Sequence, residues 1–469
     1  MNSILSLALI LMGSSCLYLL AIASSFRLSG KRRFSPPWLL LPLSGAAIIG
    51  ITLVFSVPAL PASTVPTRLL ALLAHLFNIL LIWAITSKIA PERRLPATLL
   101  YAWNPLILIE LAVYGNTSAE VICLILLAIA TPLVSILSSP LQTIVTLVLI
   151  GLAVRINFMA LLIAPLWLWF MVRHTCGVAR ALMGFAWHAL IVLAVFVVAY
   201  IPAWQGSATF LAITNALNLF NFANSPLSLV VMLARPLFKF VAQNGHFPPS
   251  LMQPGTAADM TVLATSLFLF ALLYLREMGR VRARRVGLIT HEPSRESRCI
   301  EGKGTRAAQA PPPILPTSPA PTEAFPTRPG RGGGGWEGWW GRLRRPHLHS
   351  TDNPVQGNEV ASDLLYSYHT LFTGWLVVFL GYIVLAVTVF GPGYIVWGVW
   401  IVALRRFDAL SVCALLLSCS TLLYYPLQQL APHSTAILLP VCIFSIPLVY
   451  LIVQRYIPAG KIARKNVLT

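Results

Sequence analysis

The chain has 469 residues, of which 57% are hydrophobic and only 10% are charged. Soluble globular domains carry about 25% charged residues, so this composition excludes a soluble enzyme with a single membrane anchor. The 33 Lys and Arg residues against 14 acids give a net charge of +19, but most of them lie in short clusters between apolar runs. That distribution is typical of cytoplasmic loops in a membrane protein, and we expect no nucleic-acid partner.

Apolar runs near the ~20 residues that cross a ~30 Å hydrocarbon core recur along the whole chain. Because lipid offers the backbone no hydrogen-bond partners, these runs must be helical. The first run lacks the basic n-region of a cleaved signal peptide, so we expect it to be a retained helix. We predict an all-α, polytopic transmembrane helix bundle of about 11–13 spans, at 4–25, 37–59, 68–87, 95–114, 120–137, 142–154, 157–172, 181–203, 258–276, 364–389, 393–404, 409–428 and 435–455.

The basic residues predict the orientation of these spans. With thirteen spans, the clusters of Lys and Arg follow only odd-numbered spans, at 27–33, 88–94, 173–180, 276–285, 405–406 and 455–465. They therefore share one side of the membrane, which the positive-inside rule identifies as the cytoplasm. We expect a multi-pass protein of the cell (plasma) membrane with its N-terminus and the segments 60–67, 204–257 and 429–434 outside.

The stretch 277–362 interrupts the membrane pattern with a run rich in proline and glycine, APPPILPTSPAPTEAFPTRPG followed by RGGGGWEGWWGRLRR. Such a composition buries too little surface to offset the entropy of ordering, so it predicts a disordered cytoplasmic linker. The linker separates an N-terminal transmembrane part, 1–276, with about nine spans, from a C-terminal part, 363–469, with about four spans and a basic tail. No internal repeat is visible, which weighs against an inverted-repeat transporter.

Acidic residues are scarce enough to locate any acid–base chemistry. At or near the predicted outer side lie only Glu110, Glu120 and Asp259; the remaining acids fall in the linker or at cytoplasmic helix ends. A carboxylate at the depth of Glu110 costs about 2.5–3.5 kcal/mol on insertion scales, so it should face a cavity or a cation. Arg155 lies at a similar depth. Glu110 is therefore either part of a polar substrate pocket or half of a Glu110–Arg155 ion pair that fixes helix packing.

Other polar residues are candidates for substrate binding. In the tripeptide Trp103-Asn104-Pro105, proline kinks the helix and frees a carbonyl that Asn104 can satisfy. Arg235 and Lys239 are four residues apart and, on a helix, could clamp a lipid phosphate, although ordinary headgroup anchoring explains them as well. No His or Cys spacing matches a metal site, so we expect neither a metal nor a cofactor.

Three segments carry a resemblance to a known family: RLPATLLYAWNPLILIELAVYGN at 94–116, NALNLFNFANSPLSLVV at 215–231 and FGPGYIVWGVWIVALRRFDALS at 390–411. Together they resemble the GT-C class of membrane glycosyltransferases, and within it the bacterial polyprenol-phosphate-mannose-dependent mannosyltransferases. The resemblance implies transfer of a sugar from a polyprenyl phosphate to a glycan or lipid acceptor at the outer face. The matching segments add Asn104, Asn116, Tyr394 and Trp397 to the expected substrate-binding residues, beside Arg155, Arg235 and Lys239, which were chosen above from their positions alone.

The sequence departs from this family at two places. The outer segment PALPASTVPT at 58–67 is short and lacks the acid that would act as general base, and the expected Gly-His-Asn-Asp reads Gly115-Asn116-Thr117-Ser118. Either Glu110 or Glu120 is then the catalytic base, or the chain no longer transfers sugar. The alternatives to a hexosyltransferase are a degenerate relative that binds polyprenyl lipid or a partner enzyme, and a transporter or flippase.

Overall fold

The computed structural model describes residues 13–15, 18–19, 65–112, 114–133, 138–173, 177–208, 225–243, 254–289, 354–430 and 435–456. The span expected at 37–59 and most of the span expected at 4–25 lie outside the described residues. So do 290–353, which make up most of the predicted linker, and the basic tail after 456.

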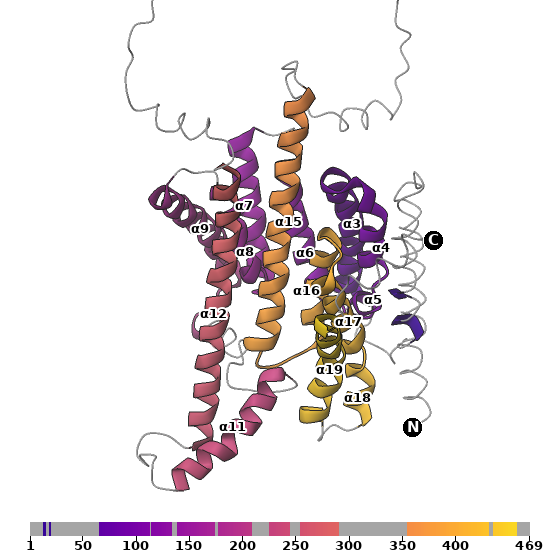
Figure 1. Cartoon of the computed structure of the whole chain (residues 1–469), viewed down its shortest axis with the longest axis vertical. Helices are drawn as coiled ribbons and strands as arrows, with labels where there is room; N and C mark the ends of the chain where they lie inside the picture. The colour runs from indigo at the N-terminus through magenta and orange to yellow at the C-terminus, as the bar shows by residue number, and fades with distance from the viewer. Residues whose placement is uncertain are drawn as a thin grey trace, which may run out of the picture. The chain divides into compact units, whose positions relative to one another are not determined.

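Every regular element in this part of the chain is a helix (Figure 1). Before the linker come α3 (Val65–Ile89), α4 (Arg94–Ala102), α5 (Pro105–Ala112), α6 (Ser118–Ala130), α7 (Ser139–Ile156), α8 (Ala160–Val172), α9 (Val178–Tyr200), α11 (Pro226–Gln243) and α12 (Pro254–Ile289). After it come α15 (Pro354–Leu385), α16 (Pro392–Leu404), α17 (Ala409–Thr421), α18 (Tyr424–Leu430) and α19 (Thr435–Tyr456). Short 3₁₀ turns at Pro91–Arg93, Thr131–Leu133 and Ile201–Ala203 adjoin three of these helices.

Eight helices within the described ranges are long and apolar enough to cross a membrane. Three further apolar helices are shorter, at Ser118–Leu133, Ala160–Val172 and Pro392–Leu404. The protein is therefore an all-α, multi-pass membrane protein, which confirms the predicted fold class. One of the eight, α11, lies inside the segment 204–257 that we expected to be an outer loop without a span. It is joined to the start of α12 by an ion pair between Arg235 and Asp259.

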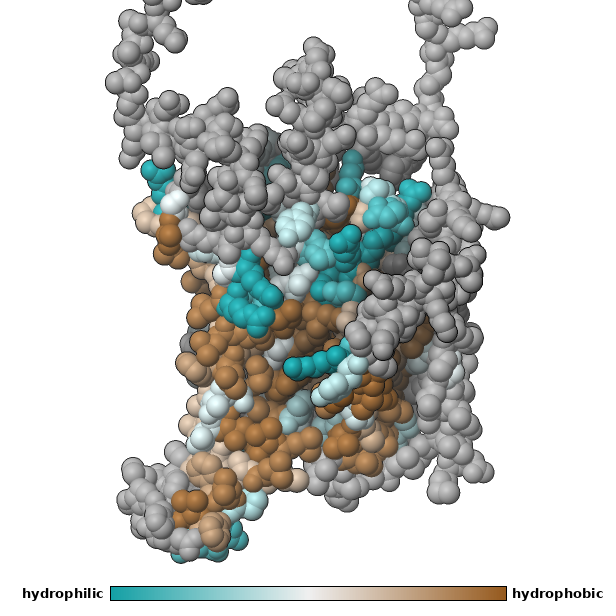
Figure 2. Space-filling model, in the orientation of Figure 1, coloured by the Kyte–Doolittle hydropathy of each residue, from teal (hydrophilic) through white to brown (hydrophobic). Residues whose placement is uncertain are grey.

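The helix α16 occupies the centre of the bundle. It packs against α3, α4, α5, α6 and α17, and every residue from Ile395 to Leu404 is buried. A helix that is apolar all round belongs in the interior, whereas a lipid-facing helix exposes apolar side chains. The helix α9 is of the second kind, with Met183 and Val198 exposed by 75% and 65%. Figure 2 shows hydrophobic residues over the middle of the visible face and hydrophilic ones gathered toward one end.

The long helices α12 and α15 run antiparallel and meet through side chains of α12 that lie against two glycines of α15. A side chain at Gly381 would collide with Leu273, and one at Gly374 would touch Glu277 and Val281. Near this interface, Trp375 donates a hydrogen bond of 3.2 Å from its indole N–H to the Ile163 carbonyl. The two glycines thus leave room for the side chains of α12.

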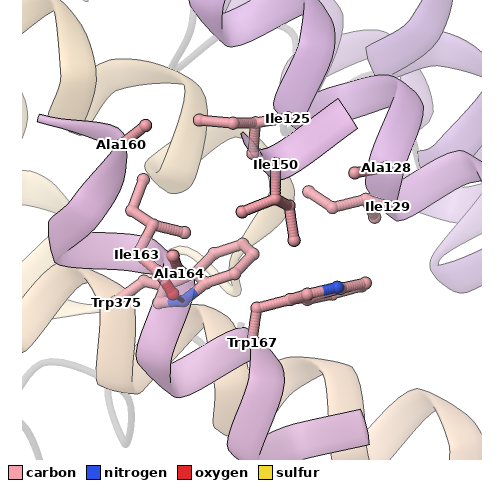
Figure 3. Close-up of a pocket in the computed structure, with 9 residues that line it drawn as sticks. All are labelled: Ile125, Ala128, Ile129, Ile150, Ala160, Ile163, Ala164, Trp167 and Trp375. Carbon is pink, nitrogen blue, oxygen red and sulfur yellow. Dashed lines mark hydrogen bonds between the residues drawn. The ribbon is translucent and has the colours of Figure 1, made fainter. Parts of the chain in front are cut away.

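A small gap in the apolar core lies between α6, α7, α8 and α15 (Figure 3). It measures about 10 Å³, and Ile125, Ile150 and Trp167 are among the apolar side chains around it. That volume is about the minimum for one water, and the lining offers almost no polar partner. The gap is therefore a packing imperfection of the core and not a binding site.

The span expected at 95–114 is two helices, because Asn104 starts a new one. The side-chain Oδ1 of Asn104 accepts hydrogen bonds from the backbone N–H groups of Leu106 (3.1 Å) and Ile107 (3.2 Å). Asn104 is thus the N-cap of α5, with Pro105 at the first helical position, where its missing N–H costs nothing. The expectation that Asn104 satisfies a freed carbonyl in one kinked helix is wrong.

Two further boundaries differ from the prediction. The span expected at 409–428 is divided into α17 and α18, with a break at 422–423. The helices α12 and α15 extend into the predicted linker, over 277–289 and 354–362. Glu277, which the sequence assigned to the linker, is buried in α12 with 2% of its side chain exposed, and it accepts a 3.0 Å hydrogen bond from Arg280.

Candidate functional site

A cavity of about 540 Å³ lies where α16 begins and α5 ends. Its lining is drawn from helices far apart in the sequence, and it combines aromatic with uncharged polar side chains and one carboxyl group. The aromatic residues are Tyr114, Tyr394, Trp397, Tyr424 and Tyr425. The polar residues are Glu110, Asn116, Ser118, Asn157 and Gln428.

Glu110 is the one ionisable acid in this lining, and its carboxylate is held by two donors. The Tyr425 hydroxyl donates to Oε1 at 2.6 Å, and the Asn116 side-chain amide donates to Oε2 at 2.8 Å. Only 6% of Glu110 is exposed. An unpaired carboxylate would be costly at this depth. Two charge-assisted hydrogen bonds reduce that cost in part and fix the orientation of the group.

A tight turn after α5 brings Asn116 to Glu110. Gly115 has φ of +61°, a conformation that glycine adopts without steric cost. The backbone N–H of Asn116 donates back to the Glu110 carbonyl at 3.1 Å. The Asn116 Oδ1 then accepts hydrogen bonds from the backbone and hydroxyl of Ser118, at 3.0 and 2.8 Å, where α6 starts. Both ends of the Asn116 side-chain amide are therefore held: the nitrogen donates to Glu110, and the oxygen accepts from Ser118.

Gly393 leaves room for the carboxylate beside the first turn of α16. A Cβ atom at this position would lie 3.1 Å from Glu110 Oε2 and would collide with the Asn116 amide nitrogen. The missing side chain therefore lets the carboxylate approach the amino end of α16. The helix dipole there favours a negative charge, which further stabilises the ionised form.

The aromatic part of the lining is centred on Tyr425. Its ring is stacked on Tyr114, with centroids 5.5 Å apart and an interplanar angle of 15°. Tyr424 meets the same ring edge-on at 5.9 Å. These contacts place three tyrosine rings along one side of the cavity, next to the carboxylate of Glu110.

The structure brings together four of the nine residues that the sequence predicts for the site. Glu110, Asn116, Tyr394 and Trp397 all line the cavity, although they come from two segments almost 300 positions apart in the sequence. The other five, Asn104, Glu120, Arg155, Arg235 and Lys239, are not among its lining residues.

The predicted ion pair between Glu110 and Arg155 does not form. Arg155 instead donates from Nε to the Ala199 carbonyl at 3.0 Å and lies 5.9 Å from the Tyr200 ring centroid. The depth of a residue along the membrane can be read from its position in a span, but the direction in which it points cannot. Of the two explanations for Glu110, the polar pocket agrees with the structure.

Asn104 and Glu120 lie elsewhere in the bundle. Asn104 is fully buried: its amide donates to the Tyr18 hydroxyl at 3.2 Å, and its Oδ1 accepts a 3.1 Å hydrogen bond from Ser418. Glu120 lies in the first turn of α6. Its Oε2 is enclosed and has no hydrogen-bond partner in the described part of the chain.

Arg235, which we considered with Lys239 as a phosphate clamp, forms an ion pair with Asp259. Its guanidinium is engaged by both carboxylate oxygens of Asp259, at 2.9 and 2.7 Å. Lys239, one turn further along α11, is exposed. Asp259 is not among the residues that line the cavity.

Sequence reasoning missed the residues that complete the site, above all Tyr425 and Gly393. The segment TLLYYPLQQL contains two adjacent tyrosines before a proline at the end of an apolar run, which is a signal for a helix break with polar side chains. No cluster of three or more His, Cys, Asp or Glu residues suited to a metal ion occurs within the ranges that the structure describes.

Comparison of the chain with protein-family models, with curated proteins and with solved structures finds no match. Its function is therefore inferred from the cavity and from the sequence motifs.

Proposed function

We propose that the protein is a membrane hexosyltransferase, which moves a sugar from a polyprenyl-phosphate donor to a glycan or lipid acceptor at the outer face of the plasma membrane. The observation that carries this proposal is the convergence of Glu110, Asn116, Tyr394 and Trp397 on one cavity. These residues come from two of the segments that resemble mannosyltransferases. Their convergence supports the resemblance because the sequence places them far apart.

The size and lining of the cavity suit a sugar. Its volume of about 540 Å³ lies within the range of small-molecule sites. Aromatic faces can stack on the C–H faces of a pyranose ring, and amide and hydroxyl groups can pair with its hydroxyls. No Lys or Arg is among the described residues of the lining. The lining therefore favours the uncharged sugar, with the donor phosphate at the edge of the cavity.

The position of the cavity agrees with transfer at the outer face. The helix α16 begins at the cavity and ends at Leu404, directly before Arg405 and Arg406. Those two arginines belong to a cluster that the positive-inside rule assigns to the cytoplasm. The cavity is at the opposite end of the same helix, which supports an extracytoplasmic site.

Glu110 is the group best placed to act as general base. In the proposed step, an acceptor hydroxyl oxygen attacks the anomeric carbon of the donor sugar. The bond between that carbon and the phosphate oxygen breaks, and polyprenyl phosphate leaves. The hydroxyl proton passes to the Glu110 carboxylate. Each carboxylate oxygen has two acceptor sites, so the hydrogen bonds from Tyr425 and Asn116 still leave a free lone pair on Oε1 and on Oε2.

A second candidate is a relative that binds polyprenyl lipid or a partner enzyme without turnover. The hydrogen bonds from Tyr425 and Asn116 to Glu110 favour this candidate too, because a carboxylate with a purely structural role is also held by protein donors on both of its oxygens.

Hexose transfer in isolated membranes tests the proposal. Membranes that contain the full chain are incubated with radiolabelled polyprenyl-phosphate hexoses, with mannose and glucose donors in parallel. We expect label to move from the donor into a glycan or lipid product, and membranes that lack the chain to show none. Absence of transfer from every donor and acceptor would favour the binding protein without turnover.

A further inference from the structure

The helix α11 is packed only along its first turns and projects from the bundle beyond them. Leu227, Ser228 and Val231 are buried, and α11 packs against α19. From Met232 to Gln243, by contrast, every residue is exposed or only half-buried. The larger part of α11 therefore has a surface that the described part of the chain leaves uncovered.

The two faces of this projecting part differ in chemistry. Leu233, Leu237 and Phe240 are exposed by 70%, 61% and 64%, and their spacing of four and three residues places them on one face of the helix, the apolar stripe. Arg235 and Lys239 each follow a leucine of the stripe by two residues, so they lie on the opposite face. A helix that is apolar on one side and basic on the other is typical of helices that lie in the plane of a membrane surface.

The ion pair between Arg235 and Asp259 fixes the level of α11 along α12. Arg235 is at the middle of α11, and both of its bonded nitrogens donate to the Asp259 carboxylate, at 2.9 and 2.7 Å. Asp259 is in the second turn of α12, about 25 Å along the helix from the basic cluster 276–285. In Figure 1, α11 lies beside this end of α12 and is inclined to it. The middle of α11 is therefore level with one end of the apolar run of α12, whereas two helices that cross a bilayer side by side would be level at their centres.

The basic clusters agree with this placement. The cluster 173–180 is at the start of α9, the cluster 276–285 is at the end of α12, and both helices are long and apolar enough to cross the membrane. The segments 209–224 and 244–253, before and after α11, are each shorter than the ~20 residues of a further span. If α11 does not cross, the two clusters lie on one side of the membrane, and if it crosses they lie on opposite sides. The positive-inside rule favours the first arrangement.

We propose that α11 is an interfacial helix, which lies along the membrane surface with its apolar stripe inserted among lipid acyl chains. Its length and composition alone would also allow it to cross the bilayer. Lipid is the occupant that fits this face, because α12, to which α11 is tied, likewise exposes Phe268 and Leu272, by 63% and 48%. On the opposite face, Lys239 is available to the phosphates of the headgroups. The inference does not depend on the proposed sugar transfer.

Measurement of depth in the bilayer tests the proposal. Single cysteines at the three positions of the apolar stripe, at Lys239 and at Gln243, in otherwise cysteine-free full-length protein, are spin-labelled in liposomes. Collision of each label with oxygen, which dissolves in lipid, is compared with collision with a water-soluble nickel complex. We expect the labels of the apolar stripe to lie about 5–10 Å below the headgroups. The labels at Lys239 and Gln243 should be in contact with water, although Lys239 is next to Phe240 in the sequence.

The helix α9 provides the matched control, because it is long and apolar enough to cross and exposes Met183, Leu190 and Val198 along its length. Depth there should be greatest at Leu190 and smaller at both ends. The same profile in α11, with the greatest depth near its middle on both faces, would show that α11 crosses the bilayer and would overturn the proposal. Contact of the apolar stripe with water would also overturn it. So would shielding of the stripe from both reagents, because a second copy of the chain or another protein would then cover this face.

Discussion

The hydroxyl of Tyr425 donates a 2.6 Å hydrogen bond to the carboxylate of Glu110, which lies 315 positions earlier in the sequence. This contact joins α18, in the part of the chain after the linker, to α5, in the part before it. The two transmembrane parts therefore build one site, and neither part would contain it alone.

Removal of this hydroxyl tests its contribution to the bundle. Tyr425→Phe should lower the free energy of unfolding by about 1.5–3 kcal/mol, because a charge-assisted hydrogen bond to an enclosed carboxylate is lost. Tyr114→Phe is the matched control, since Tyr114 stacks on Tyr425 but is 59% exposed. Denaturation in detergent would measure both. Equal stability of Tyr425→Phe and wild type would contradict the importance of the contact.

A methyl group at Gly393 should disturb the site directly. Gly393→Ala places a carbon against the Asn116 amide and 3.1 Å from Glu110 Oε2, so Asn116 must move or the carboxylate must lose its hydrogen bond. We expect hexose transfer to fall at least tenfold, because small displacements of reacting groups are costly. Gly255→Ala is the control and should retain activity, since Gly255 is not among the residues that line the cavity and nothing lies within 4 Å of its added carbon. Wild-type transfer by Gly393→Ala would show that the packing around the carboxylate does not matter.

The break between α4 and α5 depends on Asn104. Asn104→Ala removes the cap of α5 and leaves the Ser418 and Tyr18 hydroxyls without this partner, so the free energy of unfolding should drop by about 2–3 kcal/mol. Ser418→Ala removes only one of these hydrogen bonds and should cost about 1 kcal/mol. Thermal denaturation in detergent compares the two. A larger loss for Ser418→Ala than for Asn104→Ala would contradict the capping role.

The proposed orientation in the membrane rests on the basic clusters and has its own test. Single cysteines at Ser207 and Ser318 in otherwise cysteine-free protein are treated with an impermeant thiol reagent in intact cells. We expect labelling at Ser207 and none at Ser318 until the cells are opened. The reverse pattern would place the cavity on the cytoplasmic side and exclude transfer at the outer face.

The fold class was predictable because apolar runs of this length have only one stable structure in lipid. The helix breaks were harder, since Asn104-Pro105 suits a kinked helix and a capped new helix equally well until the partners are known. The same holds for the run that divides into α17 and α18. Hydropathy averages over such runs and hides a single residue that ends or begins a helix.

The site was predictable only in part. Glu110 could be identified because a carboxylate inside an apolar run is costly unless it faces a cavity or a partner. The segment around Tyr394 could be identified by its motif. The sequence left two explanations for Glu110, a polar pocket or an ion pair with Arg155, because depth along the membrane does not determine which helices are neighbours. The place of Tyr425 and Gly393 in the site depends on how α18 and α16 pack against α5, and a local sequence pattern does not contain that information.

The central claim is that Glu110 is the base of a sugar transfer, and isosteric substitution tests it most directly. In Glu110→Gln, the amide oxygen can still accept from the Asn116 amide while the new N–H donates to the Tyr425 hydroxyl oxygen. The variant should therefore insert and fold while hexose transfer falls by about 10²–10⁴-fold. Glu120→Gln, whose side chain is outside the cavity lining, should transfer at nearly the wild-type rate. Transfer that survives Glu110→Gln in folded protein, or that is lost only in Glu120→Gln, would contradict the assignment.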